Sequence, residues 1–497
     1  MSDMELAEKY IFNSNDVAQI DKASIDAKGK EFGFKLMKRA ALLSFSLLMK
    51  QNPKSVSILC GVGNNAGDGY LIGKKAIELG LETQVISIES EEKLSGDAKK
   101  AMLAFKLSGG EVNLWSINDQ INGDWIVDAI FGTGINREID SSYHDAIATI
   151  NESKSKVISI DLPSGLCGNT GKTFGAIVSA DITVTFVGMK LGLYLDKGPN
   201  NAGKVHLYDL GVDEKFYKEY EPSLEIISDK ILSEVIIPRN QSNHKGDHGH
   251  VLLIGGNNGM EGAIRIASEA SLRSGSGLVS VISTSRSCEI INQFRPEVMC
   301  YDTLDTGTIR SLMDRVDIIG VGPGLGSNDW ATQLYELAFD SNKYLVLDAD
   351  ALNILSTNQV NRGNWILTPH PGEASRLLGC SVSDIQSDRM NALTNLSEKY
   401  NADVLLKGKY TLTKSITNGT PYIVTSGNPG MASAGMGDLL TGVISSLLGQ
   451  FPNLEKRKII ASAAHIHSKA GDLAAQDGER GLIASDLLPY IRSLVNL

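Results

Sequence analysis

Thr-Ser-Gly-Asn-Pro-Gly-Met-Ala-Ser-Ala-Gly-Met-Gly-Asp-Leu-Leu-Thr-Gly, residues 425–442, is the stretch that decides the fold of the second half of this chain. It follows the apolar run 422–424 and leads into a segment whose apolar residues recur at helical spacing. These features predict a strand, a glycine-rich loop and a helix. The glycines permit a tight turn, and the first N–H groups of a helix lack partners within it, so they can bind an anion such as phosphate.

Asp438 lies beside this predicted anion site. A carboxylate there repels phosphate unless it acts as a base on the group that meets the phosphate, or on a magnesium-bound partner. The alternative role is structural, because aspartate is a preferred N-cap residue of helices. The residues of the stretch alone leave both roles open.

Length and composition predict two large α/β domains. A chain of 497 residues exceeds what one hydrophobic core usually supports. Its 50 glycines and 42% hydrophobic residues suit an α/β fold with many strand-to-helix loops. The net charge of −11 argues against nucleic acid or an anionic membrane as a partner. The N-terminal ten residues lack the apolar region of a signal peptide, so we expect a soluble cytoplasmic protein.

The five cysteines are scattered and show no C-x-x-C spacing. They lie mostly in or beside apolar runs, a pattern that predicts reduced, buried thiols.

The first half alternates apolar, β-branched runs with helical stretches, after two helices predicted within residues 14–49. The predicted strands are residues 56–61, 83–88, 125–132, 157–165, 182–188 and 205–211. Such alternation predicts a parallel, doubly wound sheet that binds ligands at the carboxyl ends of its strands.

Three of these predicted strands end in loops rich in oxygen-bearing side chains. Residues 61–69, Gly-Val-Gly-Asn-Asn-Ala-Gly-Asp-Gly, fit the dinucleotide fingerprint, although Asn and Asp also favour ordinary turns. Asp128 lies within an apolar strand and needs a partner or a cation, because a buried unpaired carboxylate is costly. Residues 161–165, Asp-Leu-Pro-Ser-Gly, repeat the arrangement. We expect the three strand ends to converge on one cleft.

These loops resemble the NAD(P)H-hydrate epimerase family, also called the YjeF N-terminal domain, over residues 13–213. The resemblance rests on Asn-Asn-x-Gly-Asp-Gly, Asp-x-x-Phe-Gly-Thr-Gly and Asp-x-Pro-Ser-Gly, which occur here in that order. It implies a Rossmann-like α/β/α sandwich over residues 1–220 and potassium ligands at Asn65, Asp128 and Ser164. It also implies substrate contacts at Asn64, Asn65, Ala66, Gly67, Asp68, Gly132, Thr133, Gly134, Ile135, Asn136, Arg137, Glu138 and Asp161. Ala66 stands where the family usually has glycine, a change that Rossmann loops accept.

The resemblance also implies a reaction. The substrate is a reduced nicotinamide whose ring has gained water at C6, and the carbon that bears the new hydroxyl is epimerised. Ring opening and reclosure would need a general acid or base near that hydroxyl. Asp161 matches the carboxylate that faces the hydroxyl, so we expect it to be catalytic.

The second half begins after a charged segment, and we expect the domain boundary near residues 219–224 and the second domain over 224–497. Predicted strands here end in further distinctive clusters at residues 255–263, 322–326, 348–351 and 368–373. Each alone fits an ordinary turn or a solvated acidic pair, but these clusters and the glycine-rich loop described first, five in one parallel sheet, argue against coincidence. No G-x-x-x-x-G-K-[ST] occurs, so a bound ADP or ATP would not use a P-loop.

Gly435-Met436-Gly437-Asp438 resembles the anion-hole loop of the ribokinase-like superfamily, and residues 427–435 resemble its branch of ADP- or ATP-dependent NAD(P)H-hydrate dehydratases. The resemblance covers residues 226–497 and implies a ribokinase-like α/β domain, with ADP or ATP as co-substrate together with Mg²⁺. The positions that it implies for substrate contact are Ala263, Gly324, His370 and Asp438. Those that it implies for the adenine nucleotide are Lys407, Gly408, Lys409, Tyr410, Thr411 and Gly437. Glu373 matches a residue that organises magnesium in related kinases.

The two resemblances together predict a bifunctional repair enzyme for NAD(P)H hydrates. Asp438 would deprotonate the C6 hydroxyl, which takes phosphate from the nucleotide, and phosphate would then leave to regenerate NADH or NADPH. One alternative is a ribokinase-like small-molecule kinase fused to a dinucleotide-binding module. Another treats the first half as a non-catalytic sensor. The expected partners are the hydrated dinucleotide, the adenine nucleotide and identical subunits in a homo-oligomer.

Overall fold

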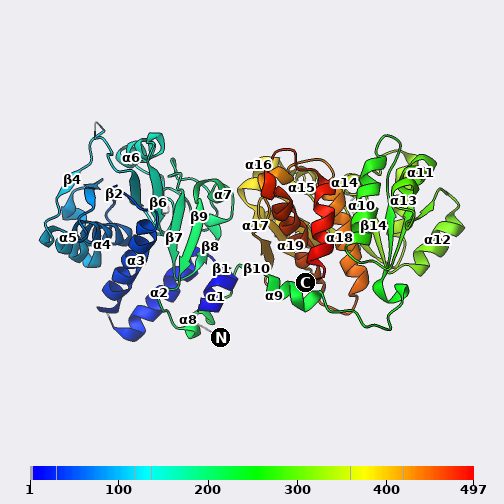
Figure 1. The fold of residues 1–497 in the computed structure, drawn as a ribbon, viewed down its shortest axis with the longest axis horizontal. Helices are drawn as coiled ribbons and strands as arrows, with labels where there is room; N and C mark the ends of the chain where they lie inside the picture. The colour runs from blue at the N-terminus through cyan, green and yellow to red at the C-terminus, as the bar shows by residue number, and fades with distance from the viewer. Residues whose placement is uncertain are drawn as a thin grey trace. The chain divides into compact units, whose positions relative to one another are not determined.

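The computed structural model describes residues 4–29, 31–117, 119–135, 137–358, 360–417 and 419–496. The chain divides into two compact units, Met1–Leu224 and Glu225–Leu497 (Figure 1). Each unit is an α/β structure built on a mainly parallel sheet, as expected. Among the residues described, no helix combines the length and the apolar character needed to cross a membrane.

The first unit contains a seven-stranded parallel sheet in the order β4-β3-β2-β5-β6-β7-β9. Its strands are β2 Ser55–Cys60, β3 Glu82–Ser87, β4 Val112–Leu114, β5 Trp125–Ala129, β6 Lys156–Ile160, β7 Ile182–Phe186 and β9 Lys204–Tyr208. The short strands β1 Tyr10–Phe12 and β8 Met189–Lys190 pair in parallel apart from it. The helices are α1 Met4–Lys9, α2 Ser14–Lys28, α3 Glu31–Met49, α4 Asn64–Glu78, α5 Gly96–Leu107, α6 Ser141–Glu152, α7 Gly198–Asn201 and α8 Glu214–Tyr217.

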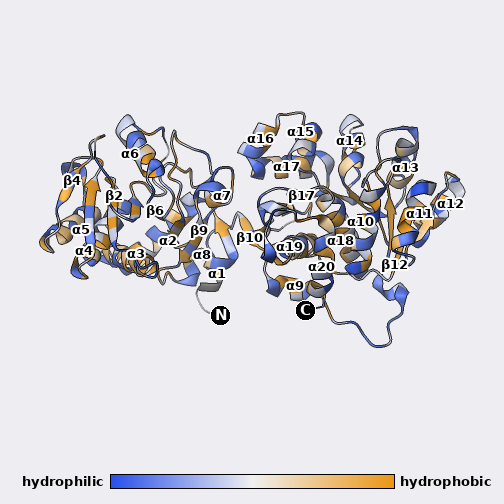
Figure 2. Ribbon diagram, turned by 45° about the horizontal axis from the view of Figure 1, so that its top comes forward, coloured by the Kyte–Doolittle hydropathy of each residue, from blue (hydrophilic) through white to orange (hydrophobic). Residues whose placement is uncertain are grey.

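Successive residues of β2 enter different cores, as the alternation of a strand requires. Ile58 belongs to a cluster with apolar residues of α3, α4 and α5, whereas Leu59 packs with those of α6. Both faces of the sheet are therefore covered, which makes the unit an α/β/α sandwich. In Figure 2 the strands carry mainly hydrophobic residues, because parallel strands buried on both faces need them.

In the second unit the strand order is β13-β12-β11-β14-β15-β16-β17-β18-β19-β10. The strands are β10 Leu224–Ile226, β11 His250–Ile254, β12 Leu278–Ile282, β13 Met299–Tyr301, β14 Ile318–Val321, β15 Tyr344–Leu347, β16 Trp365–Leu367, β17 Asp403–Leu406, β18 Thr411–Lys414 and β19 Tyr422–Val424. All neighbours pair in parallel except β18, which is antiparallel to both β17 and β19.

The helices of this unit are α9 Asp229–Val235, α10 Glu261–Arg273, α11 Ser285–Phe294, α12 Thr306–Arg315, α13 Asp329–Phe339, α14 Ala349–Thr357, α15 Pro371–Leu378, α16 Val382–Ser387, α17 Arg389–Tyr400, α18 Met436–Gln450, α19 Lys456–Ala474 and α20 Leu488–Leu494. Apolar residues of α10, α18, α19 and α20 share one core with alternate residues of the central strands. The predicted glycine-rich turn corresponds to the N-terminus of α18, and the predicted helix after it corresponds to α18 itself.

Two local predictions were wrong. Residues 64–68 were expected to form a loop, but Gly63 is extended and acts as the N-cap, so α4 already begins at Asn64. The five thiols are free, as expected, but Cys380 is exposed. It follows Gly379, whose left-handed conformation ends α15 and turns the chain outward.

Candidate active sites

A cavity of about 810 Å³ lies in the first unit at the carboxyl ends of β2, β5, β6 and β7. These strands are neighbours, so the predicted convergence of their loops is confirmed. The predicted site residues that line the cavity are Asn64, Asn65, Asp68, Gly132, Thr133, Gly134, Ile135, Arg137, Glu138 and Asp161. Ala66 is buried outside this lining, and a Cβ on Gly67 would meet Met37 of α3 and Ala98 of α5. Asn136 lies outside the described residues.

Asp161 is held at the end of β6 in a left-handed backbone conformation, with φ of 67°. Its Oδ1 lies 2.5 Å from Nζ of Lys190, and its Oδ2 accepts a hydrogen bond of 3.3 Å from the Thr133 N–H. Lys190 is 1% exposed, and its ammonium group also donates hydrogen bonds to the Thr185 hydroxyl and the Phe186 carbonyl, each at 2.8 Å. The ammonium group therefore fixes the carboxylate in place and stabilises its charge.

Asp128 is fully buried and finds its partners in the protein. Its carboxylate accepts hydrogen bonds from the Ser164 hydroxyl at 2.5 Å, the Ser164 N–H at 2.9 Å and the Ser159 hydroxyl at 2.7 Å. Burial nevertheless keeps the pKa of Asp128 above its usual value. Neither amide atom of Asn65, in the first turn of α4, has a hydrogen-bond partner among the described residues, although both are buried. This amide oxygen, with the Asp128 carboxylate and the Ser164 hydroxyl, is the kind of oxygen donor set that suits a hard cation such as potassium.

In the second unit, the 435–438 turn forms the start of α18. Gly435 is the N-cap, with φ of 88°, and Asp438 is the third residue of the helix. Asp438 is thus not the cap, and no side chain caps this helix end. Its pKa is raised to about 6 by burial and by the nearby carboxylates Asp348 and Asp350, although Lys407 opposes the shift.

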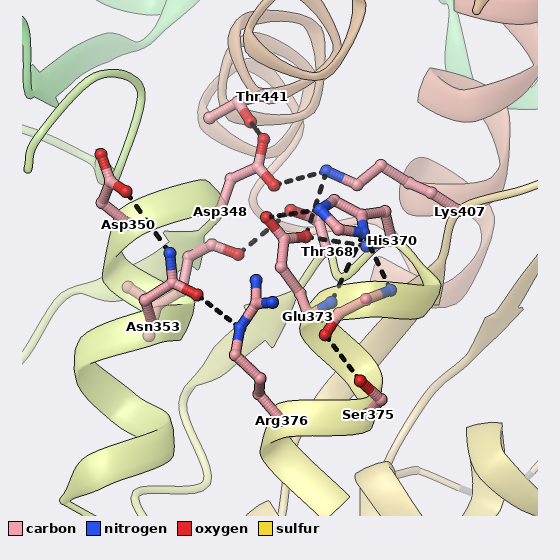
Figure 3. Close-up of polar contacts among 12 residues, drawn as sticks. Asp348, Asp350, Asn353, Thr368, His370, Glu373, Ser375, Arg376, Lys407 and Thr441 are labelled. Carbon is pink, nitrogen blue, oxygen red and sulfur yellow. Dashed lines mark hydrogen bonds and ion pairs between the residues drawn. The ribbon is translucent and has the colours of Figure 1, made fainter. Parts of the chain in front are cut away.

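A buried ion pair lies under this helix terminus (Figure 3). Nζ of Lys407, at the end of β17, lies 2.6 Å from Oδ1 of Asp348, at the end of β15. Oδ2 of the same carboxylate accepts a hydrogen bond of 2.7 Å from the Thr441 hydroxyl of α18. A Cβ on Gly437 would lie 3.3 Å from the Lys407 Nζ, so the ammonium group sits against the first turn of α18.

His370 and Glu373 cap the start of α15. The Glu373 carboxylate accepts a hydrogen bond of 2.8 Å from the His370 N–H, and His370 Nδ1 accepts one of 2.9 Å from the Gly372 N–H. Glu373 also lies 3.8 Å from the Lys407 ammonium. No cluster of three His, Cys, Asp or Glu side chains in the described part of the chain is arranged to hold a metal ion. These engaged carboxylates do not fit a magnesium site built by the protein alone.

The other predicted site residues of this unit fall into two groups. Ala263 and Gly324 are neighbours, since a Cβ on Gly324 would lie 3.1 Å from that of Ala263. The segment 407–411 turns from β17 into β18, where Thr411 begins the strand. The Lys409 ammonium group donates a hydrogen bond of 3.3 Å to the Gly427 carbonyl, so it lies apart from the ion pair of Lys407.

Buried Arg389 organises this second segment. Its guanidinium donates hydrogen bonds to the carbonyls of Lys409 at 2.6 Å and Tyr410 at 3.0 Å, and to that of Leu406 at 3.2 Å. The Arg389 side chain, which is 4% exposed, therefore fixes the main chain of the 407–410 turn from the protein interior.

The sequence interpretation missed Lys190, Thr441 and Arg389. Only Lys190 carries a local signal, because it is an isolated charge between the apolar residues Met189 and Leu191. Thr441 and Arg389 occur in helices of ordinary composition, and only the fold reveals their partners.

Comparisons with known proteins match each half of the chain to a family model. The family model of the YjeF-related protein N-terminus matches residues 33–192, and that of NAD(P)H-hydrate dehydratase matches residues 251–493. A ribokinase-like superfamily protein from Enterococcus faecalis has a TM-score of 0.52 and 29% identity, covering 56% of this chain and 97% of its own. The predicted ribokinase-like fold of the second unit is confirmed.

Two relatives match almost the whole length. Bifunctional NAD(P)H-hydrate repair enzymes from Coxiella burnetii and Escherichia coli are 38% and 36% identical to this chain. The alignments cover 98% of this chain in both cases, with 99% and 94% of the relatives. By this identity, over this length and across both family models, the chain belongs to the bifunctional NAD(P)H-hydrate repair enzyme family.

Proposed function

We propose that this chain repairs hydrated NADH and NADPH in two steps. The first unit interconverts the R and S epimers of the hydrate. The second unit dehydrates the S epimer to NAD(P)H, at the expense of ADP giving AMP and phosphate, or of ATP giving ADP and phosphate. The observation that carries this proposal is that the chain divides into two units, that a different family model matches in each, and that bifunctional relatives align over almost its whole length.

For epimerisation, Asp161 takes the proton of the C6 hydroxyl. Its support is the ion pair with Lys190, which keeps a proton-accepting carboxylate at the cavity wall. Potassium would be held by Asn65, Asp128 and Ser164, and would supply a fixed positive charge between the loops that follow β2, β5 and β6.

For dehydration, Asp438 takes the proton of the C6 hydroxyl as its oxygen accepts the terminal phosphate of the nucleotide. The uncapped N–H groups at the start of α18 and the neighbouring Lys407 ammonium would stabilise negative charge on that phosphate. The ring nitrogen then expels phosphate from C6, and loss of a proton from C5 restores the reduced nicotinamide. Magnesium would enter with the nucleotide phosphates, which usually provide part of its shell.

The test is to follow the near-ultraviolet absorbance of reduced nicotinamide after adding the protein to a mixture of both epimers. Reactions contain magnesium and potassium with ADP, ATP or no nucleotide. Nucleotide-dependent recovery from both epimers supports both activities and identifies the donor. Recovery of only the part of the substrate that was the S epimer contradicts the epimerase role. No recovery with either nucleotide contradicts the dehydratase role and favours the alternative of a small-molecule kinase.

A further inference from the structure

Asp68 is one of several carboxyl groups that line the cavity of the first unit with Asp161. Asp68 lies on α4 one helical turn after Asn65, and residues three apart on a helix lie on the same face. A Cβ on Gly132 would lie 3.1 Å from Oδ2 of Asp161 and 3.7 Å from Cγ of Asn65. The face of α4 that carries Asp68 therefore meets the cavity next to Asp161.

The Asp68 side chain is buried and lacks a full set of hydrogen-bond partners within the protein. It is 9% exposed, and its Oδ1 is buried without any hydrogen-bond partner among the described residues. Both amide atoms of Asn65 share this condition. Buried polar atoms are costly when they remain unpaired, so three of them on one wall of a cavity indicate a surface built for a polar substrate.

The two carboxyl groups differ in their environment. Asp161 is ion-paired with Lys190 at 2.5 Å. Asp68 has no ion pair among those found in the described residues, and burial together with the charges of Asp161 and Asp21 raises its pKa well above the usual value. Burial and these like charges therefore favour the protonated form of Asp68, whereas Asp161 has an ammonium partner. A pair of neighbouring carboxyl groups in such different environments is a usual arrangement of an acid–base pair.

The proposed epimerisation needs such a pair. Opening the ring at C6 removes a proton from the hydroxyl and leaves an electron pair on the ring nitrogen N1, which must be protonated. The roles proposed above assign Asp161 as the base and assign no residue as the donor of the proton to N1. We propose that Asp68 is the general acid that protonates N1 during ring opening, and the base that recovers this proton during reclosure.

The step balances without any other reactant. The hydroxyl proton passes to Asp161 as C6–O becomes a carbonyl, the C6–N1 bond breaks, and N1 takes its proton from Asp68. Rotation about the C5–C6 bond then presents the other face of the aldehyde. N1 attacks that face and returns its proton to Asp68, while the new alkoxide takes back the proton from Asp161.

This inference rests on the proposed epimerase activity, and the experiment separates the two. The full-length protein and its Asp68→Asn variant are assayed for conversion of the purified R epimer to the S epimer, and for dehydration of the S epimer. An asparagine keeps the size and a hydrogen-bonding oxygen but cannot give up a proton. We expect the kcat of epimerisation to fall by about 10² or more with KM changed little, because general acid catalysis contributes about 10²–10⁴.

Three comparisons make the result decisive. The Glu78→Gln variant removes an exposed carboxylate from the same helix and should keep the wild-type kcat. The Asp68→Glu variant keeps a transferable proton and should exceed Asp68→Asn in kcat. The double variant Asp68→Asn/Asp161→Asn should be no slower than the slower single variant, because acid and base act in one step.

An Asp68→Asn variant that retains more than a third of the wild-type kcat overturns the proposal. So does a rise in KM alone, which would make Asp68 a binding residue. If Asp68→Asn does not fold, an Asp68→Glu variant that folds but has no epimerase activity above Asp161→Asn counts against it too. A wild-type protein that does not epimerise the hydrate refutes the proposed function instead.

Discussion

Asp438 lies at the N-terminus of a helix, and the pKa of its carboxyl group is raised towards neutrality. The N–H groups of the 435–438 turn attract an anion, and Asp438 lies on the same first turn of α18. Burial and the carboxylates of Asp348 and Asp350 raise its pKa to about 6, against the attraction of Lys407. A base of this pKa is charged at neutral pH and yet binds protons better than an ordinary aspartate.

The pKa of Asp438 predicts the acid limb of the dehydratase reaction. A base works only when deprotonated, so kcat/KM should rise with pH and level off above about pH 6. Initial rates with the S epimer between acidic and neutral pH give the profile. Asp438→Ala should remove dehydration and leave epimerisation intact. A profile flat down to the pKa of an ordinary aspartate would mean that another group is the base.

The Lys407–Asp348 pair predicts a large cost for losing the cation. Asp348 is 1% exposed and would keep a buried charge without its ammonium partner. Removal of one member of a buried pair costs about 3–5 kcal/mol, so Lys407→Met should lower the unfolding free energy of the second unit by about that amount. Urea unfolding followed by fluorescence or circular dichroism measures the change.

A surface pair in the same unit provides the control. Lys469 bonds Asp229, whose side chain is 61% exposed, so Lys469→Met should cost only about 0.2–1 kcal/mol. The double variant Asp348→Asn/Lys407→Met should recover part of the stability lost in Lys407→Met, because the orphaned charge is gone. Equal losses in Lys407→Met and Lys469→Met would contradict the ion-pair account.

At the scale of elements, the site depends on how closely α18 packs on α10. A Cβ on Gly442 of α18 would lie 2.2 Å from the Ala267 carbonyl oxygen of α10 and 2.9 Å from the Ala270 Cβ. The Ala267 oxygen is a backbone atom and the Ala270 Cβ is bonded to the backbone, so neither can rotate away from an added methyl group. Only glycine at residue 442 allows α18 to lie where its N-terminus meets Lys407.

Gly442→Ala should therefore destabilise the second unit and weaken dehydration. Overpacking of a core costs about 1–3 kcal/mol, and a shift of α18 would also move Asp438. The matched control is Gly262→Ala in α10, where a Cβ meets nothing within 4 Å. That change should leave the stability unchanged or raise it slightly, because Gly262 lies in the first turn of α10 and not in its interior. Thermal unfolding compares the two, and a stabilised Gly442→Ala variant would refute the packing argument.

The elements that were predictable from sequence are those whose burial leaves a continuous apolar run. This applies to the central strands β2, β5, β11 and β14. The motifs that follow these strands predicted the edge of each sheet at which ligands are expected to bind. The short edge strands β4 and β13 were missed because they are only partly buried. β18 was not predicted, and only its first residue, Thr411, was assigned, as a nucleotide contact; the sequence does not reveal the antiparallel pairing of this strand.

The same limit applies to the sites. Glycine-rich and acidic motifs are local, so Asp161, Asp348 and Asp438 stood out in the sequence. The ion pairs that they form did not stand out, because Lys190 follows Asp161 by 29 residues and Lys407 follows Asp348 by 59. One sequence contains no record of which distant residues meet, and the charge state of each carboxyl group is set by such partners.

At the scale of the whole molecule, the two sites lie in different compact units, and each draws its residues from its own sheet. The proposed intermediate, the S epimer, is a complete dinucleotide that can leave one site and enter another. Activity of one site should therefore not require an intact partner site in the same chain. Asp161→Asn and Asp438→Ala each remove one activity, so they provide a direct test of this independence.

A mixture of the Asp161→Asn and Asp438→Ala proteins should recover reduced nicotinamide from both epimers. The Asp438→Ala chain supplies the S epimer in solution, and the Asp161→Asn chain dehydrates it. Asp161→Asn alone should regain only the S share beyond slow spontaneous epimerisation, and Asp438→Ala alone should regain nothing. Full recovery by the mixture, at a rate that rises with either protein, means free diffusion of the intermediate. Recovery limited to the S share, with each single activity intact, would mean that the epimer passes only between sites of one chain.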